Sequence, residues 1–521
     1  MKTLDALYSA GPEKRLNGAA KSAYSAWELL ASLVRTGSRR VLEKIQIREL
    51  ACHSARVRPG SLYFCLPGRK VDGHSYAREA AAAGAVAIVA ERALPIGASG
   101  IPVIVVEDTR EALALAAARF YGFPAEKINL IGVTGTNGKT TTTYYLQSIF
   151  QAAGLPAAVV GSNGARFNNW VLQLDHTTPP SLELQQCLAM LKEKGAGVVA
   201  MEVSSHALIQ RRVAHCSFNS AVFTNITRDH LDYHGTMQDY FKAKALLIGL
   251  LKKEAGSGII LNADDPSYRR LVALAGAERL KVPYAIRSPF APVRASDVSA
   301  DQKGRCSFNL LGWHRPLQIS LQLPGIFNVY NALAAAAVAW KEKLPAEAVR
   351  EGLNGLEAVP GRLEEISIDT PAITVIIDYA HTPDSLRQVL LLLRKRAPRR
   401  LITVFGCPGE RDRGKRPLMG RIAEELSDLV VLTADNPASE RVEDIIGQIR
   451  EGMRSNPVEI ADRAEAVHYA LSQARDGDLV LLAGKGAEEY QLVGTEMIPY
   501  NDRRTVEKFM ASQRRPGTPP R

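Results

Sequence analysis

One stretch, GVTGTNGKTTTTYYL at 132–146, constrains the fold of this chain more than any other. An apolar run typical of a buried strand precedes Gly135, and Gly135 and Gly138 favour a tight turn after that strand. A helical stretch begins at Lys139, so its free N–H groups and its dipole favour an anion at the turn. We therefore predict a strand, a phosphate-binding loop and a helix, in that order.

The loop pattern also predicts roles for individual side chains. We expect the Lys139 ammonium to reach the outer phosphates and the Thr140 hydroxyl to be a ligand of Mg²⁺. A strict phosphate loop has glycine five residues before Gly138, where this chain has Val133, so the match is to a variant pattern. The alternative is a glycine-rich turn that binds nothing. The residues expected to contact the nucleotide are Gly135, Thr136, Asn137, Gly138, Lys139, Thr140 and Thr141.

Composition narrows the class of protein. A chain of 521 residues is too long for one compact core and predicts about three domains. The net charge is +11, but lysines and arginines are interleaved with acidic residues, and the clearest basic cluster is the tail at 512–521. Excess positive charge also suits small polyanionic substrates, so we expect no nucleic-acid partner.

Targeting signals and cysteine pairs are not apparent in the sequence. The first residues, MKTLDALYSAGPEKRL, have no apolar core of signal-peptide length, and no apolar run is long enough for a membrane span. The six cysteines are scattered without metal-binding spacing, which favours reduced thiols. We therefore expect a cytoplasmic protein.

Strands and helices alternate along the chain in three blocks, which predicts an α/β fold with three domains at 1–107, 108–358 and 359–521. The central block has the pattern of a doubly wound parallel sheet, and residues 290–325 alternate apolar and polar residues as antiparallel strands do. An alanine-rich helix over 109–124 is expected to connect the first two blocks.

Two polar side chains follow strands of the central block. The strand AGVVAMEV ends at Glu202, and His230 follows the next strand in TNITRDHLDYHG. Carboxyl ends of parallel strands share one edge of a sheet, so we expect both residues near the phosphate loop as Mg²⁺ ligands.

Several motifs together resemble the Mur ligase family of peptidoglycan synthesis. Within that family the chain is most similar to the MurE branch, which adds the third residue to UDP-N-acetylmuramoyl-L-alanyl-D-glutamate. The resemblance covers nearly the whole chain and implies a central P-loop ATPase domain, an N-terminal UDP-substrate domain and a C-terminal Rossmann-like domain. It rests on TGTNGKTT (134–141), TTPPSLEL (177–184), MEVSSHALIQRR (201–212), FTNITRDHLDYHG (223–235), DYAHTPDSL (378–386) and GERDRGKRP (409–417).

The resemblance implies a reaction. ATP phosphorylates the terminal carboxylate of the substrate, and an amine then displaces phosphate to form an amide. Cations must neutralise the repulsion between the two anions. The implied catalytic residues are Lys139, His230 and Lys244, the implied Mg²⁺ ligands are Thr140, Glu202, His230 and a carbamylated Lys244, and the further implied ATP contacts are Asn331, Arg362 and Asp378.

The same resemblance implies where the UDP-substrate binds. The first domain departs from the family pattern, because it has His53-Ser54-Ala55-Arg56 where an Asp-Ser-Arg run is usual. The implied contacts are Ser54, Arg69, Lys70 and Val71 in the first domain, and Thr177, Thr178, Ser204, Gln210 and Arg212 in the second.

The amino acid that is added depends on the third domain. Family members that add meso-diaminopimelate have Asp-Asn-Pro-Arg, but this chain ends the motif with Ala438. A buried carboxylate without its cation costs several kcal/mol, about a hundredfold in preference or more. We therefore expect L-lysine, with ornithine, diaminopimelate or another amine as alternatives, and Arg441 as a possible substitute cation. The implied amino-acid contacts are Arg411, Asp435, Asn436, Ala438, Gly484 and Glu488.

Three other readings remain open. A folylpolyglutamate synthetase shares the chemistry but lacks the UDP-binding domain and the SSHALIQRR run, whereas a MurE-like ligase of a specialised pathway would explain the departures from the family pattern. A nucleotide-binding regulator without turnover is the third. We expect a monomer whose substrates are the UDP-dipeptide and a diamino acid.

Overall fold

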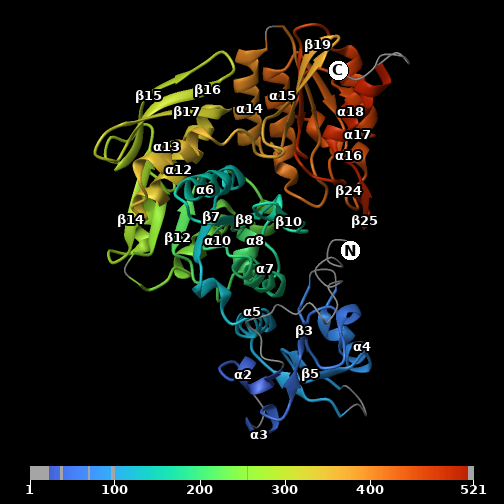
Figure 1. Cartoon of the computed structure of the whole chain (residues 1–521). Helices are drawn as coiled ribbons and strands as arrows, with labels where there is room; N and C mark the ends of the chain where they lie inside the picture. The colour runs from blue at the N-terminus through green and yellow to red at the C-terminus, as the bar shows by residue number, and fades with distance from the viewer. Residues whose placement is uncertain are drawn as a thin grey trace.

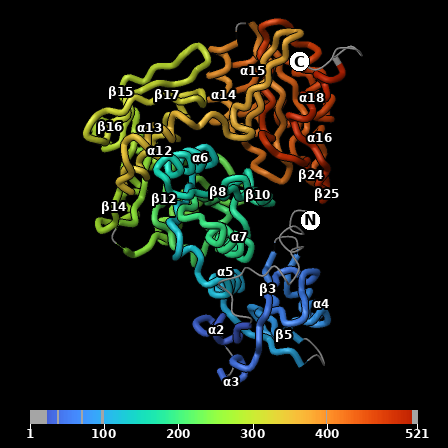
Figure 2. Tube along the Cα trace, viewed as in Figure 1, coloured from blue at the N-terminus to red at the C-terminus, as the bar shows by residue number. Residues whose placement is uncertain are grey.

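The computed structural model describes residues 23–35, 39–68, 71–95, 100–254, 256–397 and 399–513. Three α/β units follow one another along the chain, and each has its own main sheet (Figures 1 and 2). Arg69, Lys70 and the end of the basic tail lie outside the described residues, so the substrate contacts expected at 69 and 70 are not placed.

The N-terminal unit has a parallel sheet of four strands in the order β3-β4-β5-β6. Helix α5 packs against α2 and also contacts α7 (Ser181–Glu193) of the next unit, so it connects the two as predicted. The elements of this unit are β1 (Tyr24–Ser25), α2 (Ala26–Leu30), α3 (Arg39–Leu42), β2 (Gln46–Ile47), β3 (Glu49–Ala51), β4 (Ser61–Phe64), α4 (Ala77–Ala82), β5 (Ala85–Ala90), β6 (Val103–Val105) and α5 (Thr109–Phe120).

The central unit has an eleven-stranded mixed sheet in the order β10-β9-β8-β11-β7-β12-β13-β14-β15-β16-β17. Strands β8 to β15 of this order run parallel, and antiparallel pairs close both edges. The strands are β7 (Asn129–Thr134), β8 (Ala157–Gly161), β9 (Gly164–Phe167), β10 (Trp170–Leu172), β11 (Val198–Glu202), β12 (Ser220–Phe223), β13 (Gly258–Asn262), β14 (Leu280–Ala285), β15 (Val293–Ala300), β16 (Arg305–Leu311) and β17 (Leu317–Pro324).

The two antiparallel edges differ in how well the sequence predicted them. Strands β15 to β17 lie in the range expected to be antiparallel, so that expectation is confirmed. The β8-β9-β10 meander was not predicted. Gly164 begins β9 and Asn168 lies in the turn between β9 and β10, and both have positive φ. Asparagine and glycine adopt that conformation at low cost, so the turns at 161–169 were a signal that we missed.

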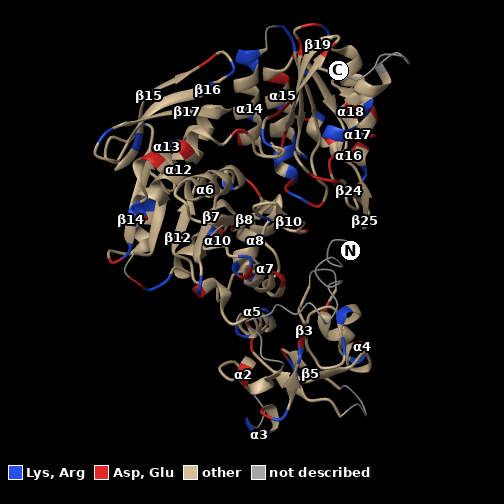
Figure 3. Cartoon of the chain, in the orientation of Figure 1, with Lys and Arg blue, Asp and Glu red and all other residues tan. Residues whose placement is uncertain are grey.

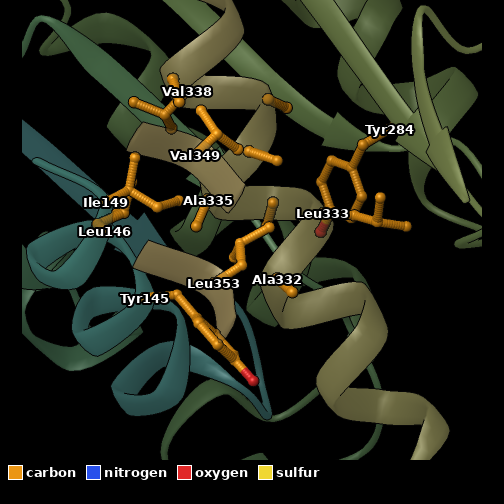
Figure 4. Packing of buried hydrophobic residues seen from close by; sticks show 14 of the residues in the cluster. Tyr145, Leu146, Ile149, Tyr284, Ala332, Leu333, Ala335, Val338, Val349 and Leu353 are labelled. Atoms are coloured by element: carbon orange, nitrogen blue, oxygen red, sulfur yellow. The ribbon is translucent and has the colours of Figure 1, made fainter. Parts of the chain in front are cut away.

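Helices cover both faces of the central sheet. Tyr145 and Ile149 of α6 pack against Leu333 of α12 and Leu353 of α13 on one face (Figure 4). A side chain at Gly352 would lie 2.4 Å from the Ile149 Cα, so α13 approaches α6 too closely for any larger residue. The helices of this unit are α6 (Lys139–Ala152), α7, α8 (Ser205–Ile209), α9 (Leu231–His234), α10 (Met237–Gly249), α11 (Tyr268–Ala275), α12 (Ile326–Lys341) and α13 (Ala346–Asn354).

The C-terminal unit has a six-stranded sheet in the order β18-β19-β23-β20-β21-β22, parallel except for the β18-β19 pair. Its elements are β18 (Glu364–Asp369), β19 (Ala372–Asp378), α14 (Pro383–Arg396), β20 (Leu401–Phe405), α15 (Arg416–Leu426), β21 (Leu429–Leu432), α16 (Val442–Arg450), β22 (Val458–Glu459), α17 (Arg463–Gln473), β23 (Leu479–Ala483), β24 (Tyr490–Val493), β25 (Glu496–Pro499) and α18 (Asp502–Gln513).

Charge and cysteine placement agree with the sequence expectations. Basic and acidic residues are interspersed over all three units (Figure 3). All six cysteines are free, and five of them are buried. Among the described residues, no helix is both long enough and apolar enough to cross a membrane.

Candidate active site

The phosphate loop joins β7 to α6 and requires glycine at two positions. Gly135 and Gly138 have φ values of 151° and 85°. A side chain at Gly135 would lie 1.8 Å from the Thr224 hydroxyl oxygen, and one at Gly138 would lie 2.2 Å from Asn331 Oδ1. Because only glycine fits, the backbone of the loop approaches its neighbours closely at the start of α6. The N–H groups of Thr136 and Asn137 both donate to Asn225, at 2.8 and 2.9 Å.

The Lys139 ammonium folds back over this loop. Its Nζ donates to the carbonyl oxygens of Gly135 and Thr136 at 2.9 and 2.8 Å. Burial lowers the pKa of Lys139. The lysine therefore lies at the loop, where an incoming phosphate can replace the two carbonyl partners.

Thr140 and Glu202 meet beside the loop, as the strand-end argument predicted. The Thr140 hydroxyl donates to Glu202 Oε1 at 2.9 Å, and the Ser162 N–H donates to the same oxygen at 2.8 Å. Glu202 is 1% exposed, and a side chain at Gly161 would lie 2.2 Å from its carboxylate. A hydroxyl and a carboxylate are oxygen ligands of the kind that Mg²⁺ prefers.

This pair does not form a complete metal cage. No three histidine, cysteine, aspartate or glutamate side chains gather into a metal site within the described part of the chain. Mg²⁺ at nucleotide sites usually has one or two protein ligands, and phosphate oxygens and water complete its shell. The donor set therefore fits a nucleotide-bound Mg²⁺ better than a resident structural metal.

Lys244 is buried beside the loop. It is 1% exposed, its Nζ donates to the Gly135 carbonyl at 2.7 Å, and it lies 4.6 Å from the centre of the Tyr240 ring. Burial, and next the Lys139 ammonium, lower the pKa of Lys244 well below its usual value. A solvated surface lysine, the alternative that the helical sequence allowed, is therefore wrong for this position.

His230 lies on a loop, seven residues beyond the end of β12 and directly before α9, so the strand-end placement is wrong in detail. Its φ of 55° is left-handed, and its Nε2 lies 3.3 Å from Asp229 Oδ2. The ring of His206 stacks edge-on at 4.7 Å.

The C-terminal unit contributes an arginine to the phosphate loop. Arg362 Nη2 donates to the Thr140 hydroxyl at 2.8 Å, and the guanidinium lies 4.6 Å from the centre of the Tyr379 ring. Asn137 Nδ2 donates to Asp384 Oδ2 at 2.9 Å across the same boundary. The loop thus lies between the two units, and both contact it.

Asp378 and Asn331 already have protein partners. Asp378 accepts from the N–H groups of Leu363 and Ala380, each at 2.8 Å, and burial raises its pKa. Asn331 Nδ2 donates to Asn328 Oδ1 at 2.9 Å. Their expected contacts with the ribose and the adenine region stay predictions.

A second set of contacts between these units was missed by sequence reasoning. Arg228 contacts both carboxylate oxygens of Asp412 at 3.2 Å, and the buried Lys415 ammonium lies 3.5 Å from Asp229. His381 lies 3.8 Å from the same aspartate. Both partners of each pair lie inside motifs quoted for the resemblance, but only the fold shows which residues meet.

Five residues expected to bind the UDP-substrate lie close together in the central unit. Thr178 Oγ1 donates to the Glu202 carbonyl at 2.9 Å and accepts from the Ser204 N–H at 3.0 Å, while Arg212 donates to the Thr178 carbonyl at 2.8 Å. Arg212 also donates to Gln210 Oε1, and the Thr177 hydroxyl lies 3.1 Å from the Ser162 hydroxyl. These five residues extend the hydrogen-bond network that begins at Thr140 and Glu202.

Two of the substrate contacts implied in the first domain, Ser54 and Val71, lie among the described residues. Ser54 begins a short 3₁₀ helix at Ser54–Arg56, and Val71 is exposed. Arg56 of that helix lies 3.6 Å from Glu183 on α7, so this segment faces the central unit.

The residues expected to bind the amino acid lie at the ends of β21 and β23. Gly484 has φ 111°, and a side chain there would lie 2.6 Å from Asp435 Oδ2. Asn436 Nδ2 donates to Glu488 Oε2 at 3.0 Å, and the buried Lys485 ammonium donates to the same oxygen at 2.7 Å. Glu488, one of the implied amino-acid contacts, already pairs with Lys485, which the sequence analysis did not identify.

Ala438 is half-buried and Arg411 is exposed. Ala438 has a left-handed φ of 49°, and its N–H donates to the Leu492 carbonyl at 3.0 Å. Arg411 lines a pocket of about 490 Å³ whose walls come from the central and C-terminal units.

Comparison with known proteins identifies the family. Three family models match: Mur ligase family, catalytic domain (46–121), Mur ligase middle domain (133–339), and Mur ligase, glutamate ligase domain (361–486). The chain is 42% identical over 469 residues to the UDP-N-acetylmuramoyl-L-alanyl-D-glutamate–2,6-diaminopimelate ligase of Syntrophomonas wolfei, covering 89% of this chain and 95% of that protein. The chain belongs to the Mur ligase family.

Three further comparisons agree with this assignment. The ligase of the same name from Geobacter metallireducens is 43% identical over 484 residues, covering 89% of this chain and 94% of that protein. A solved structure of a diaminopimelate ligase of this name has a TM-score of 0.64 at 30% identity, covering 94% of this chain and 99% of the other. The ADP-bound MurF ligase of Thermotoga maritima shares the fold, with a TM-score of 0.63 at 19% identity over 89% of this chain and 97% of that one.

The chain is thus an ATP-dependent acid–amino-acid ligase of the UDP-N-acetylmuramoyl-tripeptide synthetase type, MurE. This Mur ligase has the three-part α/β architecture that the sequence predicted.

Proposed function

We propose that this Mur ligase joins a diamino acid to the D-glutamate carboxylate of UDP-N-acetylmuramoyl-L-alanyl-D-glutamate in peptidoglycan precursor synthesis, through an acyl phosphate. The observation that carries the proposal is the shared hydroxyl of Thr140, which contacts Glu202 of the central unit and Arg362 of the C-terminal unit. Residues from both units thus meet at the point where ATP phosphates would bind.

The mechanism follows from the need to bring two anions together. Lys139 and Arg362 would hold the phosphates and offset the charge that builds up between them and the D-glutamate carboxylate. Mg²⁺ bound by Thr140 and Glu202, with a second ion at His230 and Lys244, would supply further neutralisation. Contacts between the units, such as Asn137 with Asp384, would keep water away from the acyl phosphate.

Carbamylation of Lys244 belongs to this proposal. Carbon dioxide reacts with a neutral amine, and burial beside Lys139 favours the neutral form of Lys244. The carbamate would turn a buried amine into an oxygen ligand next to the loop. Carbon-13 NMR after incubation with labelled bicarbonate would detect it without any assay of activity, and a spectrum identical to that of the Lys244→Met variant would contradict it.

The UDP-substrate would lie on the network around Thr178. Arg212 and the hydroxyls of Thr177 and Ser204 offer charge-assisted and neutral hydrogen bonds to an acidic peptide. Because Thr178 bonds directly to the Glu202 backbone, a substrate held there would lie beside the metal ligands. The first-domain contacts at 54 and 69–71 remain part of the proposal.

We propose meso-diaminopimelate as the first candidate for the added amino acid. It is supported by the names of relatives that are 42–43% identical over about nine-tenths of the chain. These names favour what the sequence analysis gave as an alternative.

L-lysine is the second candidate, and one observation favours it. Ala438 lacks the arginine that the resemblance associates with the distal carboxylate, and its left-handed backbone is fixed by Leu492 and Gly494. Ornithine and a specialised pathway stay as further alternatives, and gene neighbourhood would distinguish a cell-wall role from a specialised one.

One assay tests the proposal. The purified protein is given ATP, Mg²⁺ and the UDP-dipeptide, and phosphate release is measured with meso-diaminopimelate, L-lysine, L-ornithine or no amino acid. We expect release that depends on both the UDP-dipeptide and a diamino acid. No release with any of them, beside an active control ligase, would contradict the ligase proposal and favour a regulator without turnover.

A further inference from the structure

We propose that Arg413 is the cation that receives a second carboxylate of the amino-acid substrate. The proposal deepens the function proposed above and rests on it. Relatives of this chain are named for a dicarboxylic amino acid, whereas this chain has alanine at 438, where the resemblance implies an arginine.

The pocket of about 490 Å³ is lined by two arginines and four carboxylates, which are Arg411, Arg413, Asp232, Glu410, Asp412 and Glu440. Two of these carboxylates are paired with arginines outside the pocket lining, Asp412 with Arg228 and Glu440 with Arg416. A diaminopimelate has two carboxylates and two amines, whereas lysine has only one carboxylate. The two arginines match the two carboxylates, with Arg411 for one and Arg413 for the other, and the remaining acidic residues can face the amines.

Arg413 has one weak ion pair within the protein. Its only carboxylate contact among the described residues is Glu440, at 3.3 Å. Glu440 is already paired with the buried Arg416, which contacts both carboxylate oxygens at 2.9 and 3.2 Å. The hydrogen-bonded Arg416 guanidinium lowers the pKa of Glu440, although burial acts in the opposite direction. A bound carboxylate would therefore meet an arginine whose neighbour is already neutralised.

Other charged residues nearby are less suited to bind a second carboxylate. Asp412 is paired with Arg228, so it does not compete for Arg413. Arg441, the substitute that the sequence suggested, has a 75% exposed side chain, pairs with Glu443 at 3.6 Å and does not line this pocket. Arg413 has a 66% exposed side chain and lines the pocket.

The test compares Arg413→Gln, Arg413→Lys and Arg441→Gln with the unchanged protein. For each, kcat and KM are measured with meso-diaminopimelate and with L-lysine at saturating ATP, Mg²⁺ and UDP-dipeptide. We expect Arg413→Gln to raise KM for diaminopimelate by at least about tenfold, because one charged partner is lost. Its kcat and its kinetics with lysine should stay within about twofold, as is usual for an exposed substitution. Arg413→Lys should restore part of the loss.

Each outcome bears on one claim. Equal loss with both amino acids, no loss with either, or a loss confined to Arg441→Gln would overturn the role of Arg413. Use of lysine but not diaminopimelate by the unchanged protein would also overturn it, while leaving the ligase function intact. Inactivity of the unchanged protein with every amino acid would instead defeat the proposed function.

Discussion

The nucleotide side and the amino-acid side of this ligase are built in different ways. At the nucleotide side, Thr140, Glu202 and Lys244 are almost fully buried and contact one another or the phosphate loop. At the amino-acid side, Arg413 and Ser439 line an open pocket. A buried network tolerates little change, whereas an exposed wall can change its charges at small cost to folding. Substitutions on the nucleotide side should therefore be tolerated less well than substitutions on the amino-acid side.

The largest expected effect is at the phosphate loop. Lys139→Met should lower kcat for phosphate release by about a thousandfold, since it removes a charge aimed at the transferring phosphoryl group. Thermal unfolding and binding of the UDP-dipeptide serve as controls for folding. A loss of less than tenfold in kcat would show that the nucleotide side tolerates substitution, and would contradict the difference described above.

The second prediction concerns the support beneath the amino-acid side. Arg463 is fully buried, contacts both oxygens of Asp502 at 2.9 and 2.8 Å, and donates to the carbonyls of Ala434 and Ala483 beside the site. Arg463→Met should lower the free energy of unfolding by about 3–5 kcal/mol, because Asp502 is left buried and unpaired.

A matched substitution separates burial from charge loss. Arg450 pairs with Glu459 at 2.9 Å, but both side chains are exposed, so Arg450→Met should cost about 1 kcal/mol or less. Urea unfolding followed by fluorescence measures both variants. Similar decreases in the free energy of unfolding for the two variants would show that the buried Arg463–Asp502 pair stabilises the protein no more than an exposed ion pair does.

The third prediction uses two glycines with similar backbones. Gly138 and Gly154 have φ values of 85° and 74°, but only Gly138 has a close neighbour, Asn331. Gly138→Ala should weaken ATP binding by about tenfold or more, through a shifted Asn331 and loop. Gly154→Ala meets nothing within 4 Å and should cost only stability, about 1 kcal/mol. Calorimetric titration with ATP distinguishes them, and equal affinities would refute the steric argument.

The smallest expected effect is at the half-buried Ala438. Ala438→Arg should shift kcat/KM from lysine toward meso-diaminopimelate by about tenfold, because it adds a cation near a partly solvated carboxylate. The φ of 49° at this residue limits the gain, since side chains adopt it at some cost. An unchanged ratio would place the selection elsewhere in the pocket.

The sequence predicted the fold well wherever patterns are local. Alternating strands and helices, the phosphate loop and the connector α5 follow from apolar periodicity and glycine placement. The β8-β9-β10 meander was missed because β9 and β10 have only four and three residues, too few for a clear periodicity. The antiparallel β18-β19 pair was missed because the direction of a strand depends on its partner.

The site was predictable to the level of single elements. Glu202 and Thr140 could be paired, because both lie where strands end or a helix begins. The Lys415–Asp229 and Lys485–Glu488 pairs could not, since each depends on side-chain directions or on two domains that meet. Burial of Lys244 likewise depends on tertiary packing, which a helical sequence alone does not fix.

The acyl-phosphate intermediate can be tested by following oxygen from the substrate carboxylate into the released phosphate. The D-glutamate carboxylate of the UDP-dipeptide is labelled with oxygen-18, and the inorganic phosphate released with a diamino acid is analysed by mass spectrometry. We predict one labelled oxygen in each phosphate, because the carboxylate oxygen bridges to phosphorus in the acyl phosphate. Phosphate that carries no label, released alongside the amide product, would contradict the account.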